Sequence, residues 1–177
     1  MIVEVVRGTA GQCRTGGPPC WVPRCREPRP RGPALPSLTF PSLHQFVLDS
    51  TDIRSLAEFY RQLLGYSYRP GDEPPPQGTD DERGRDWLVL VEAPGTVALA
   101  FQQVPRLPAS TWPEDGVAQQ AHLDLVVSTR EELEVQHARA LELGARVLSD
   151  RSDDATEALR VYADPAGHPF CIFVHEH

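Results

Sequence analysis

An internal repeat constrains the fold of this chain more than any other feature of its sequence. A strand, a helix and three further strands occur in that order twice, first from LHQFVLD (43–49) and again from AHLDLVV (121–127). Units of this kind cannot bury their apolar faces alone, so two similar copies are expected to pack on one another. We therefore predict an α+β fold of two βαβββ modules, at about residues 42–104 and 120–175.

The helix of the first module is the clearest predicted element. Any residue of the STD triplet at 50–52 can cap its start, and Gly65 can end it. Its apolar positions follow a 3.6-residue spacing; they are Ile53, Leu56, Tyr60, Leu63 and Leu64. Alternating or apolar runs predict strands at 43–49, 66–68, 86–92 and 97–104, and the polar, proline-rich segment 69–85 predicts a long loop.

The second module repeats this order of elements. Thr129 can cap a helix that runs to Gly144, and the turn DPAGHP (164–169) precedes the last strand. Strands are predicted at 121–127, 145–150, 159–163 and 170–174. Residues 105–120 have proline and glycine but no period, which predicts a linker. Its Trp112 is expected to pack onto the body of the protein, with a place in a pocket wall as the alternative.

The charge balance excludes broad binding to nucleic acids. The chain has 177 residues, a net charge of −8 and no lysine, whereas contacts with phosphates need clustered basic residues.

No apolar run approaches the roughly 20 residues of a membrane-spanning helix, and the start of the chain lacks the pattern of a secretory signal. Nucleotide-binding glycine loops and a serine nucleophile elbow are absent. We expect a cytoplasmic protein without a nucleic-acid or membrane partner.

The first forty-one residues differ from the rest. They carry six Arg against two Glu, whereas the remainder carries eleven Arg against 23 acidic residues. A segment this rich in proline and glycine buries too little apolar surface to compensate for the conformational entropy that it would lose on folding. Residues 1–41 are therefore predicted to be a disordered tail that precedes a domain at 42–177, or the product of a start site assigned too far upstream. The cysteines of this segment, Cys13, Cys20 and Cys25, match no common zinc spacing.

The opening strands of the two modules each carry polar residues on one face. In AHLDLVV, His122 and Asp124 alternate with leucines, because side chains of a strand point to opposite faces in turn. In LHQFVLD the same alternation places Gln45 and Asp49 together. We expect the apolar face of each strand to pack on a helix and the polar face to line a ligand site.

Two carboxylates on these inner faces need a partner or a raised pKa. They are Asp49 and Asp124, and a carboxylate against an apolar sheet is costly when it is ionised and unpaired. Arg54 and Arg160 are the candidate partners.

Segments of both modules carry a family resemblance. The pattern D-x-x-x-L-x-x-F-Y-x-x-L-L-G at 52–65, and the series HLDLVV, LELGARVL and YADPAGHPFCIF in the second module, resemble the vicinal oxygen chelate superfamily, also called the glyoxalase-like fold. The resemblance covers about residues 42–175. It implies that the paired modules form an open, cup-shaped mixed sheet, with the helices outside and the ligand site inside.

Metalloenzymes of this superfamily hold a divalent ion with residues on the first and last strands of the modules. By position, the resemblance places Gln45, His122 and Cys171 at such sites, with Phe101 or Gln102 near the fourth. Cys171 stands where these enzymes usually carry a glutamate. Because neutral ligands hold divalent ions weakly and the glutamate that could act as a base is missing, glyoxalase I activity is not expected. Gln45 and His122 are the candidate ligands if a divalent metal ion binds.

Two functions compete on these grounds. The favoured one is a protein that binds a small apolar or aromatic molecule in the cup, without a complete metal site, His122 being a hydrogen-bonded pocket residue. The alternative is a metal-dependent lyase, isomerase or dioxygenase of the superfamily; a structural module that forms a homodimer is a third. The residues expected to line the pocket are Gln45, Asp49, Trp87, Phe101, His122, Asp124 and Cys171, with Trp112 and Phe170 as further walls.

Overall fold

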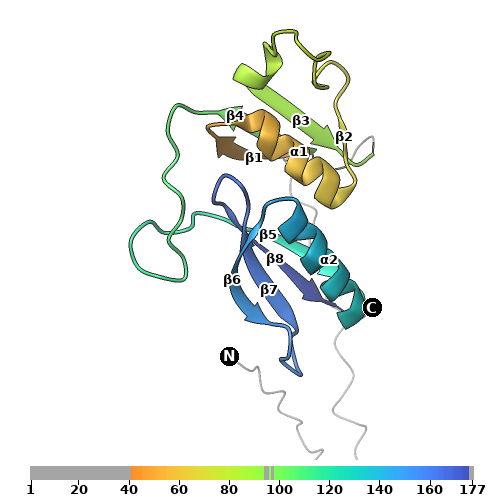
Figure 1. The fold of residues 1–177 in the computed structure, drawn as a ribbon, viewed down its shortest axis with the longest axis vertical. Helices are drawn as coiled ribbons and strands as arrows, with labels where there is room; N and C mark the ends of the chain where they lie inside the picture. Colours follow the sequence, from red (N-terminus) through yellow and green to blue (C-terminus); the bar gives the residue numbers. More distant parts are fainter. Residues whose placement is uncertain (1–40, 94–95, 97, 176–177) are drawn as a thin grey trace, which may run out of the picture. The chain divides into compact units, whose positions relative to one another are not determined.

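Two modules of one topology, each with a four-stranded sheet and one α-helix, make up the described part of the computed structural model (Figure 1). The structure describes residues 41–93, 96 and 98–175. The first module contains β1 (Gln45–Ser50), α1 (Ile53–Leu64), β2 (Ser67–Tyr68), the 3-10 helix η1 (Arg83–Arg85), β3 (Trp87–Val91) and β4 (Ala98–Gln103). The second contains β5 (Leu123–Val127), α2 (Arg130–Glu142), β6 (Arg146–Arg151), β7 (Leu159–Ala163) and β8 (Pro169–Val174). The predicted pair of βαβββ modules is confirmed.

Both sheets are mixed and have the same strand order. The orders are β1-β4-β3-β2 and β5-β8-β7-β6. In each module the first strand pairs in parallel with the last, and the other pairs are antiparallel. The parallel pair sets residues that are far apart in the chain side by side, for example Asp124 and Cys171.

The two helices begin at the predicted caps. The Asp52 carboxylate accepts a hydrogen bond from the Ser55 amide (3.0 Å), and the Thr129 hydroxyl accepts one from the Glu132 amide (3.1 Å). α1 ends at Gly65, whose φ of 72° is the left-handed conformation that favours glycine. α2 ends one residue earlier than the sequence predicts, because Leu143 and not Gly144 is the cap. The predicted loop 69–85 contains the short helix η1.

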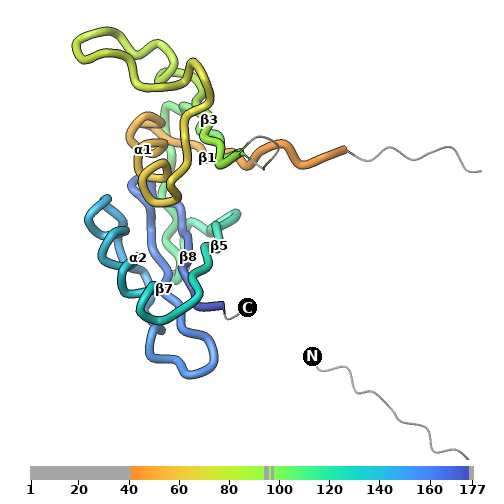
Figure 2. Tube along the Cα trace, turned by 90° about the vertical axis from the view of Figure 1, so that its right-hand side faces the viewer, coloured from red at the N-terminus to blue at the C-terminus, as the bar shows by residue number. Residues whose placement is uncertain are grey.

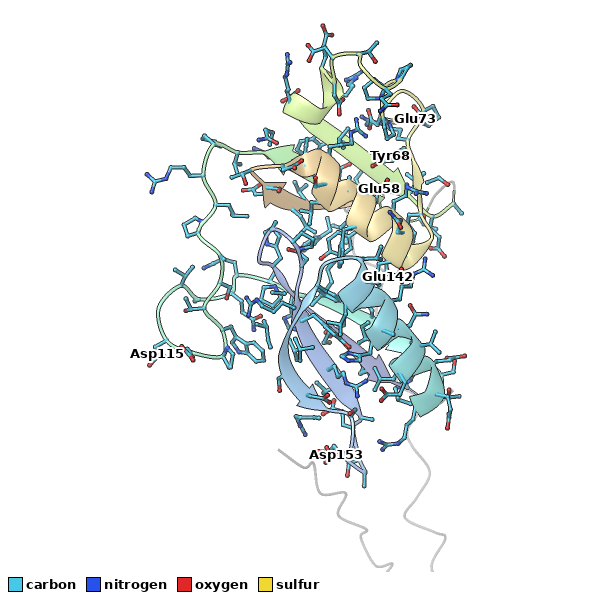
Figure 3. The ribbon with its side chains drawn as sticks, viewed as in Figure 1. Glu58, Tyr68, Glu73, Asp115, Glu142 and Asp153 are labelled. Atoms are coloured by element: carbon cyan, nitrogen blue, oxygen red, sulfur yellow. The ribbon has the colours of Figure 1, made fainter. Side chains whose placement is uncertain are left out.

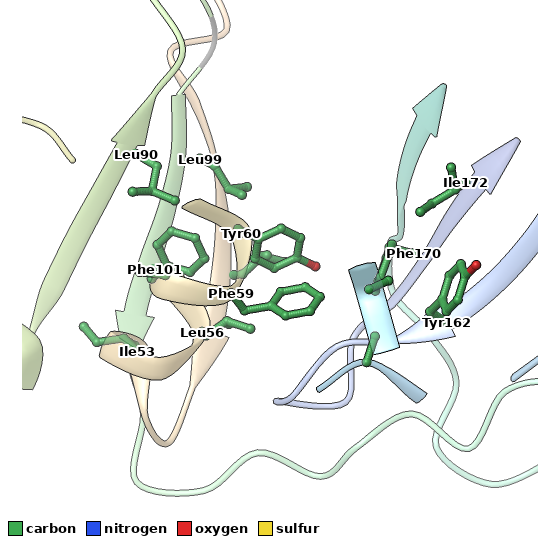
Figure 4. Packing of buried hydrophobic residues seen from close by; sticks show 14 of the residues in the cluster. Ile53, Leu56, Phe59, Tyr60, Leu90, Leu99, Phe101, Tyr162, Phe170 and Ile172 are labelled. Carbon is green, nitrogen blue, oxygen red and sulfur yellow. The ribbon is translucent and has the colours of Figure 1, made fainter. Parts of the chain in front are cut away.

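Aromatic side chains of both modules share one buried cluster (Figure 4). The ring of Phe170 lies 5.8 Å from that of Phe59, 6.3 Å from that of Tyr60 and 5.1 Å from that of Tyr162, measured between centroids. Phe59 and Tyr60 belong to α1, whereas Phe170 and Tyr162 belong to the second sheet. The apolar faces of the two modules are therefore buried against each other, as the repeat predicts.

A buried carboxylate joins the modules beside this cluster. Asp164 is 4% exposed; it accepts hydrogen bonds from the Tyr60 hydroxyl and from the amides of Ala166 and His168, each at 2.9 Å. Burial raises the pKa of Asp164. The His168 ring reaches back to the first module, with Nε2 2.7 Å from the carbonyl oxygen of Asp49. The Asp164 carboxylate and the His168 ring of this turn thus both find partners within the protein.

Arg54 and Arg160 do not pair with the carboxylates that the sequence suggested. Arg54 binds Asp81 (2.7 Å), and Arg160 binds Asp150 and Glu134 (2.9 Å each). Burial acts to raise the pKa of Asp150, but hydrogen bonds, chiefly from Arg160, outweigh it and lower this pKa from 3.8 to about 2. The stability that ionised Asp150 contributes is therefore present above about pH 4 and is lost as the pH falls through about 2.

Acid is accordingly expected to destabilise the wild-type protein more than the Asp150→Asn variant. Asparagine does not titrate, so the variant should lose less of its thermal midpoint between about pH 4 and about pH 2. Thermal unfolding followed by circular dichroism measures both midpoints. Asp153→Asn, at the tip of the β6–β7 connection (Figure 3), is the control and should follow the wild-type curve. Identical acid dependence of Asp150→Asn and wild type would contradict the assignment.

Two expectations from the sequence, a disordered tail and the absence of a membrane-spanning helix, can be compared with the described residues only in part. The predicted tail at 1–41, with its three cysteines, lies outside the described residues except for Pro41. No helix in the described ranges is long and apolar enough to cross a membrane.

α2 covers one face of the second sheet (Figure 2), and its apolar partners there include Leu125, Phe170 and Ile172. The opposite face of this sheet is open to a pocket.

Candidate functional site

A pocket of about 450 Å³ lies on the helix-free face of the second sheet. We call it the second-sheet pocket. All four strands of the sheet contribute to it, together with residues of the linker that precedes β5. Its lining consists of Trp112, Gln119, His122, Asp124, Ser149, Arg151, Glu157, Leu159, Val161, Cys171 and Phe173.

Alternation along the strands decides which side chains reach this pocket. Asp124 pairs with Cys171, and Cys171 pairs with Val161 on its other side, so the three form a row on the same face. Their chain neighbours Leu125, Phe170 and Tyr162 point to the α2 side and join the core. The polar face of the segment that begins at His122 therefore lines the pocket.

Two polar side chains contact the Asp124 carboxylate. The Cys171 thiol donates a hydrogen bond to Asp124 Oδ1 (2.6 Å), and His122 Nε2 lies 3.2 Å from the same oxygen. Burial and, next, the hydrogen bond to Asp124 raise the pKa of the Cys171 thiol to about 12. At neutral pH the thiol is therefore protonated, which makes it a hydrogen-bond donor and a poor nucleophile.

These residues are not arranged to bind the divalent ion that is found in metalloenzymes of the superfamily that this chain resembles. His122 Nε2 and the Cys171 thiol both point at one oxygen of Asp124, and a thiol must lose its proton to bind a metal. Gln45, the other candidate ligand, does not line the second-sheet pocket. Within the described ranges no group of three or more His, Cys, Asp or Glu side chains is placed to hold a metal ion.

A second pocket, of about 490 Å³, lies where β1 meets the linker and the turn before β8. We call it the linker pocket. Asp49 and Gln102 line it from the first sheet, His168 from the turn, and linker residues between Leu107 and Ala121 from the remaining side. Gln119 lines both pockets, so the two are adjacent.

Gly167 lets the linker approach the turn closely. Its φ is +96°, and a β-carbon added there would lie 2.6 Å from the β-carbon of Ala109. Only a residue without a side chain fits this contact. The turn of the second module therefore fixes where the linker passes the two pockets.

The predicted site residues separate into four places. His122, Asp124 and Cys171 meet in the second-sheet pocket, and Asp49 lines the linker pocket. Gln45 and Trp87 line neither pocket. Phe101 is fully buried, 6.0 Å from the ring of Tyr60, because Leu99 and Phe101 face α1 whereas Ala100 and Gln102 face away.

The aromatic walls also differ from those expected. Phe170 lies in the core, whereas Phe173, three residues later, lines the second-sheet pocket. Trp112 lines this pocket as well, the alternative that the sequence did not favour. Sequence reasoning did not single out the lining residues of β6, β7 and the connection between them, which are Ser149, Arg151, Glu157, Leu159 and Val161. Strand alternation, applied to 146–151 and 159–163, could have found most of them.

Comparisons with known proteins identify the family and the fold. Residues 45–173 match the family model described as a glyoxalase-like domain. A glyoxalase/bleomycin resistance protein/dioxygenase family enzyme from Burkholderia phytofirmans has a TM-score of 0.54 at 17% identity, over 76% of this chain and 98% of that one. A glyoxalase/dioxygenase from Nostoc punctiforme has a TM-score of 0.54 at 19% identity, over 81% of this chain and 100% of that one.

A third solved structure is similar to this chain as well. A glyoxalase/bleomycin resistance protein/dioxygenase from Nocardioides has a TM-score of 0.51 at 19% identity, over 80% of this chain and 87% of that one. No curated protein matches the chain. At these identities the solved structures support the fold alone.

Proposed function

Since the chain belongs to the family of glyoxalase-like domains, we propose that it binds a small molecule in the second-sheet pocket without the help of a metal ion. The observation that carries the proposal is the composition of this pocket: apolar side chains of the two central strands, β8 and β7, lie between hydrogen-bonding groups of the two outer strands, β5 and β6. Ligand sites of proteins usually have this character, with mostly apolar walls and a few polar groups that orient the ligand.

The apolar part of the pocket comes from two strands and the linker. Leu159, Val161 and Phe173 lie on β7 and β8, and Trp112 belongs to the linker. All four are partly exposed, so a bound apolar group would remove their remaining surface from water. Burial of such surface favours binding by about 25 cal/mol per Å².

The polar part suits recognition better than bond-breaking chemistry. The Cys171 thiol is held by its hydrogen bond to Asp124, and His122 lies beside the same oxygen; a thiol with a raised pKa supplies neither a nucleophile nor a ready metal ligand. The metal-dependent alternative requires His122 and Asp124 to turn toward a common ion. Metal analysis of the purified protein distinguishes the two functions.

Filling the pocket should weaken binding of an apolar probe. Val161→Trp is expected to weaken binding of N-phenyl-1-naphthylamine, a neutral dye whose emission rises in apolar sites, by about tenfold or more. Val135→Trp is the matched control, because Val135 is 63% exposed on α2 and lines neither pocket. Ser149→Trp fills the pocket from the neighbouring strand and serves if Val161→Trp does not fold.

Chelation supplies the second half of this test. Dialysis against EDTA should leave dye binding by the wild-type protein unchanged, and the purified protein should hold less than one equivalent of any divalent metal. Equal dye binding by wild type and both filling variants would overturn the assignment of the pocket. A stoichiometric ion that is lost in His122→Ala, together with loss of binding on chelation, would favour the metal-dependent enzyme.

A further inference from the structure

The charges around the second-sheet pocket narrow the class of ligand, provided that the proposed function holds. Its titratable lining residues are His122, Asp124, Arg151, Glu157 and Cys171. Two of these are carboxylates, and Arg151 is the single residue among them with a permanent positive charge. The balance between these groups decides whether the pocket favours a cation, an anion or a neutral molecule.

The positive charge of Arg151 is already compensated. Its guanidinium forms a salt bridge with Asp154 (2.8 Å) three residues along the chain. This bond from Arg151, together with the amides of Thr156 and Glu157, lowers the pKa of Asp154 to about 2, so Asp154 is ionised at neutral pH. The charge of Glu157 acts on the same guanidinium. One cation therefore faces two carboxylates on this side of the pocket.

The negative charge of Asp124 is not cancelled by its thiol neighbour. The Cys171 thiol donates a hydrogen bond but stays neutral, because its pKa is raised. The Asp124 side chain is 59% exposed, so a ligand can reach its free oxygen. His122 is the remaining basic group, and it contacts the same oxygen, Oδ1, as the thiol does. Oδ2 of Asp124 has no partner among the described residues.

We propose that the second-sheet pocket selects an organic cation, a protonated or quaternary amine attached to an apolar, preferably aromatic, group. The cationic head pairs with Asp124, and the apolar body lies against Leu159 and Val161. Phe173 and Trp112 add aromatic surface, and aromatic rings attract cations through their π-systems. An anion of the same shape would meet the carboxylates of Asp124 and Glu157 and bind less well.

Three probes that share a phenyl ring test this charge preference. They are 2-phenylethylamine, 2-phenylethanol and 3-phenylpropanoate, each measured by its displacement of N-phenyl-1-naphthylamine from the full chain. The amine is expected to displace the dye at a concentration about tenfold lower than the alcohol. The propanoate should be the weakest of the three.

Asp124→Asn removes the charge with almost no change in shape. In this variant the apparent affinity for the amine should fall about tenfold, to that of the alcohol, and the affinity for the alcohol should stay within about twofold. Glu142→Gln makes the same change of charge at the exposed end of α2 (Figure 3), away from both pockets, and should leave all three affinities unchanged. His122→Gln should keep the preference for the amine, because the preference comes from Asp124.

Salt dependence tests the same idea in the wild-type protein, even if Asp124→Asn does not fold. Added sodium chloride should weaken binding of the amine and leave binding of the alcohol unchanged, because salt screens a charge pair. If the alcohol or the propanoate binds as tightly as the amine, the cation preference is wrong while the pocket still binds ligands. If the dye itself does not bind, or binds Val161→Trp and Ser149→Trp as tightly as it binds the wild-type protein, the proposed function fails first.

Discussion

Replacing Phe170 by alanine is expected to lower the free energy of unfolding by about 4 kcal/mol. The Phe170 ring is fully buried and touches the rings of Phe59, Tyr60 and Tyr162. Its removal leaves a cavity where the two modules meet, and rigid neighbours on three sides cannot close it. The lost transfer free energy and the lost contacts therefore add.

Phe173→Ala is the matched control for this variant. Phe173 lies on the same strand but points to the second-sheet pocket, where its ring is only partly buried. The same substitution should cost about half as much or less, because less apolar surface is lost and water can enter. Urea unfolding followed by tryptophan fluorescence measures both. Equal destabilisation by the two variants would mean that Phe170 does not hold the modules together.

Asp164→Ala is expected to cost about 3 kcal/mol. The substitution leaves three donors without an acceptor in a buried place: the Tyr60 hydroxyl and the amides of Ala166 and His168. A loss of this size should lower the thermal midpoint by roughly 10 °C in a domain of this length. The amides cannot find water without opening the turn, so the position of His168 against Asp49 should also be lost.

Two further variants separate the parts of this effect. Tyr60→Phe removes one of the three donors and should cost about 1 kcal/mol. Asp153→Ala, at an exposed turn, should change stability by less than about 0.5 kcal/mol. Differential scanning calorimetry gives the midpoints and enthalpies. If Asp164→Ala were no more destabilising than Tyr60→Phe, the two amide contacts would contribute nothing and the turn would not depend on the carboxylate.

The same turn also connects stability to the candidate site. Ala166, Gly167 and His168 line the linker pocket, and Gly167 receives the close contact of Ala109. The linker in turn brings Trp112 and Gln119 to the second-sheet pocket. The proposed ligand binding in that pocket would therefore depend on a segment whose position is set by the turn, some fifty residues further along the chain.

Much of the fold could be predicted from the sequence because its signals are local. A helix needs a cap, a period of 3.6 and a stop, and α1 has all three in Asp52, the Ile53 to Leu64 stripe and Gly65. A half-buried strand needs a period of two, which β1 and β5 show. The repeated order of these signals was enough to predict two βαβββ modules, and the family match and the solved structures confirm them.

The composition of the site was predicted less well, since it depends on contacts between distant residues. Alternation shows that Asp124 is polar-facing, but the parallel pairing of β5 with β8 determines that Cys171 is its neighbour. Phe101 lies on the face of β4 that packs against α1 and therefore belongs to the core. Gln45 does not line the pocket that contains His122. Neither pairing nor register follows from the period of a single strand.

The sequence by itself therefore determined the elements, their order, the starts of the two helices and the polar and apolar faces of the opening strands, all of which depend on residues a few positions apart. Only the tertiary structure decided that Asp124, Cys171 and His122 share one carboxylate oxygen, that Trp112 and Phe173 form the walls, and that Arg160 is taken up by Asp150 and Glu134. The physical reason is that these contacts join segments whose separation in the chain carries no periodic signal.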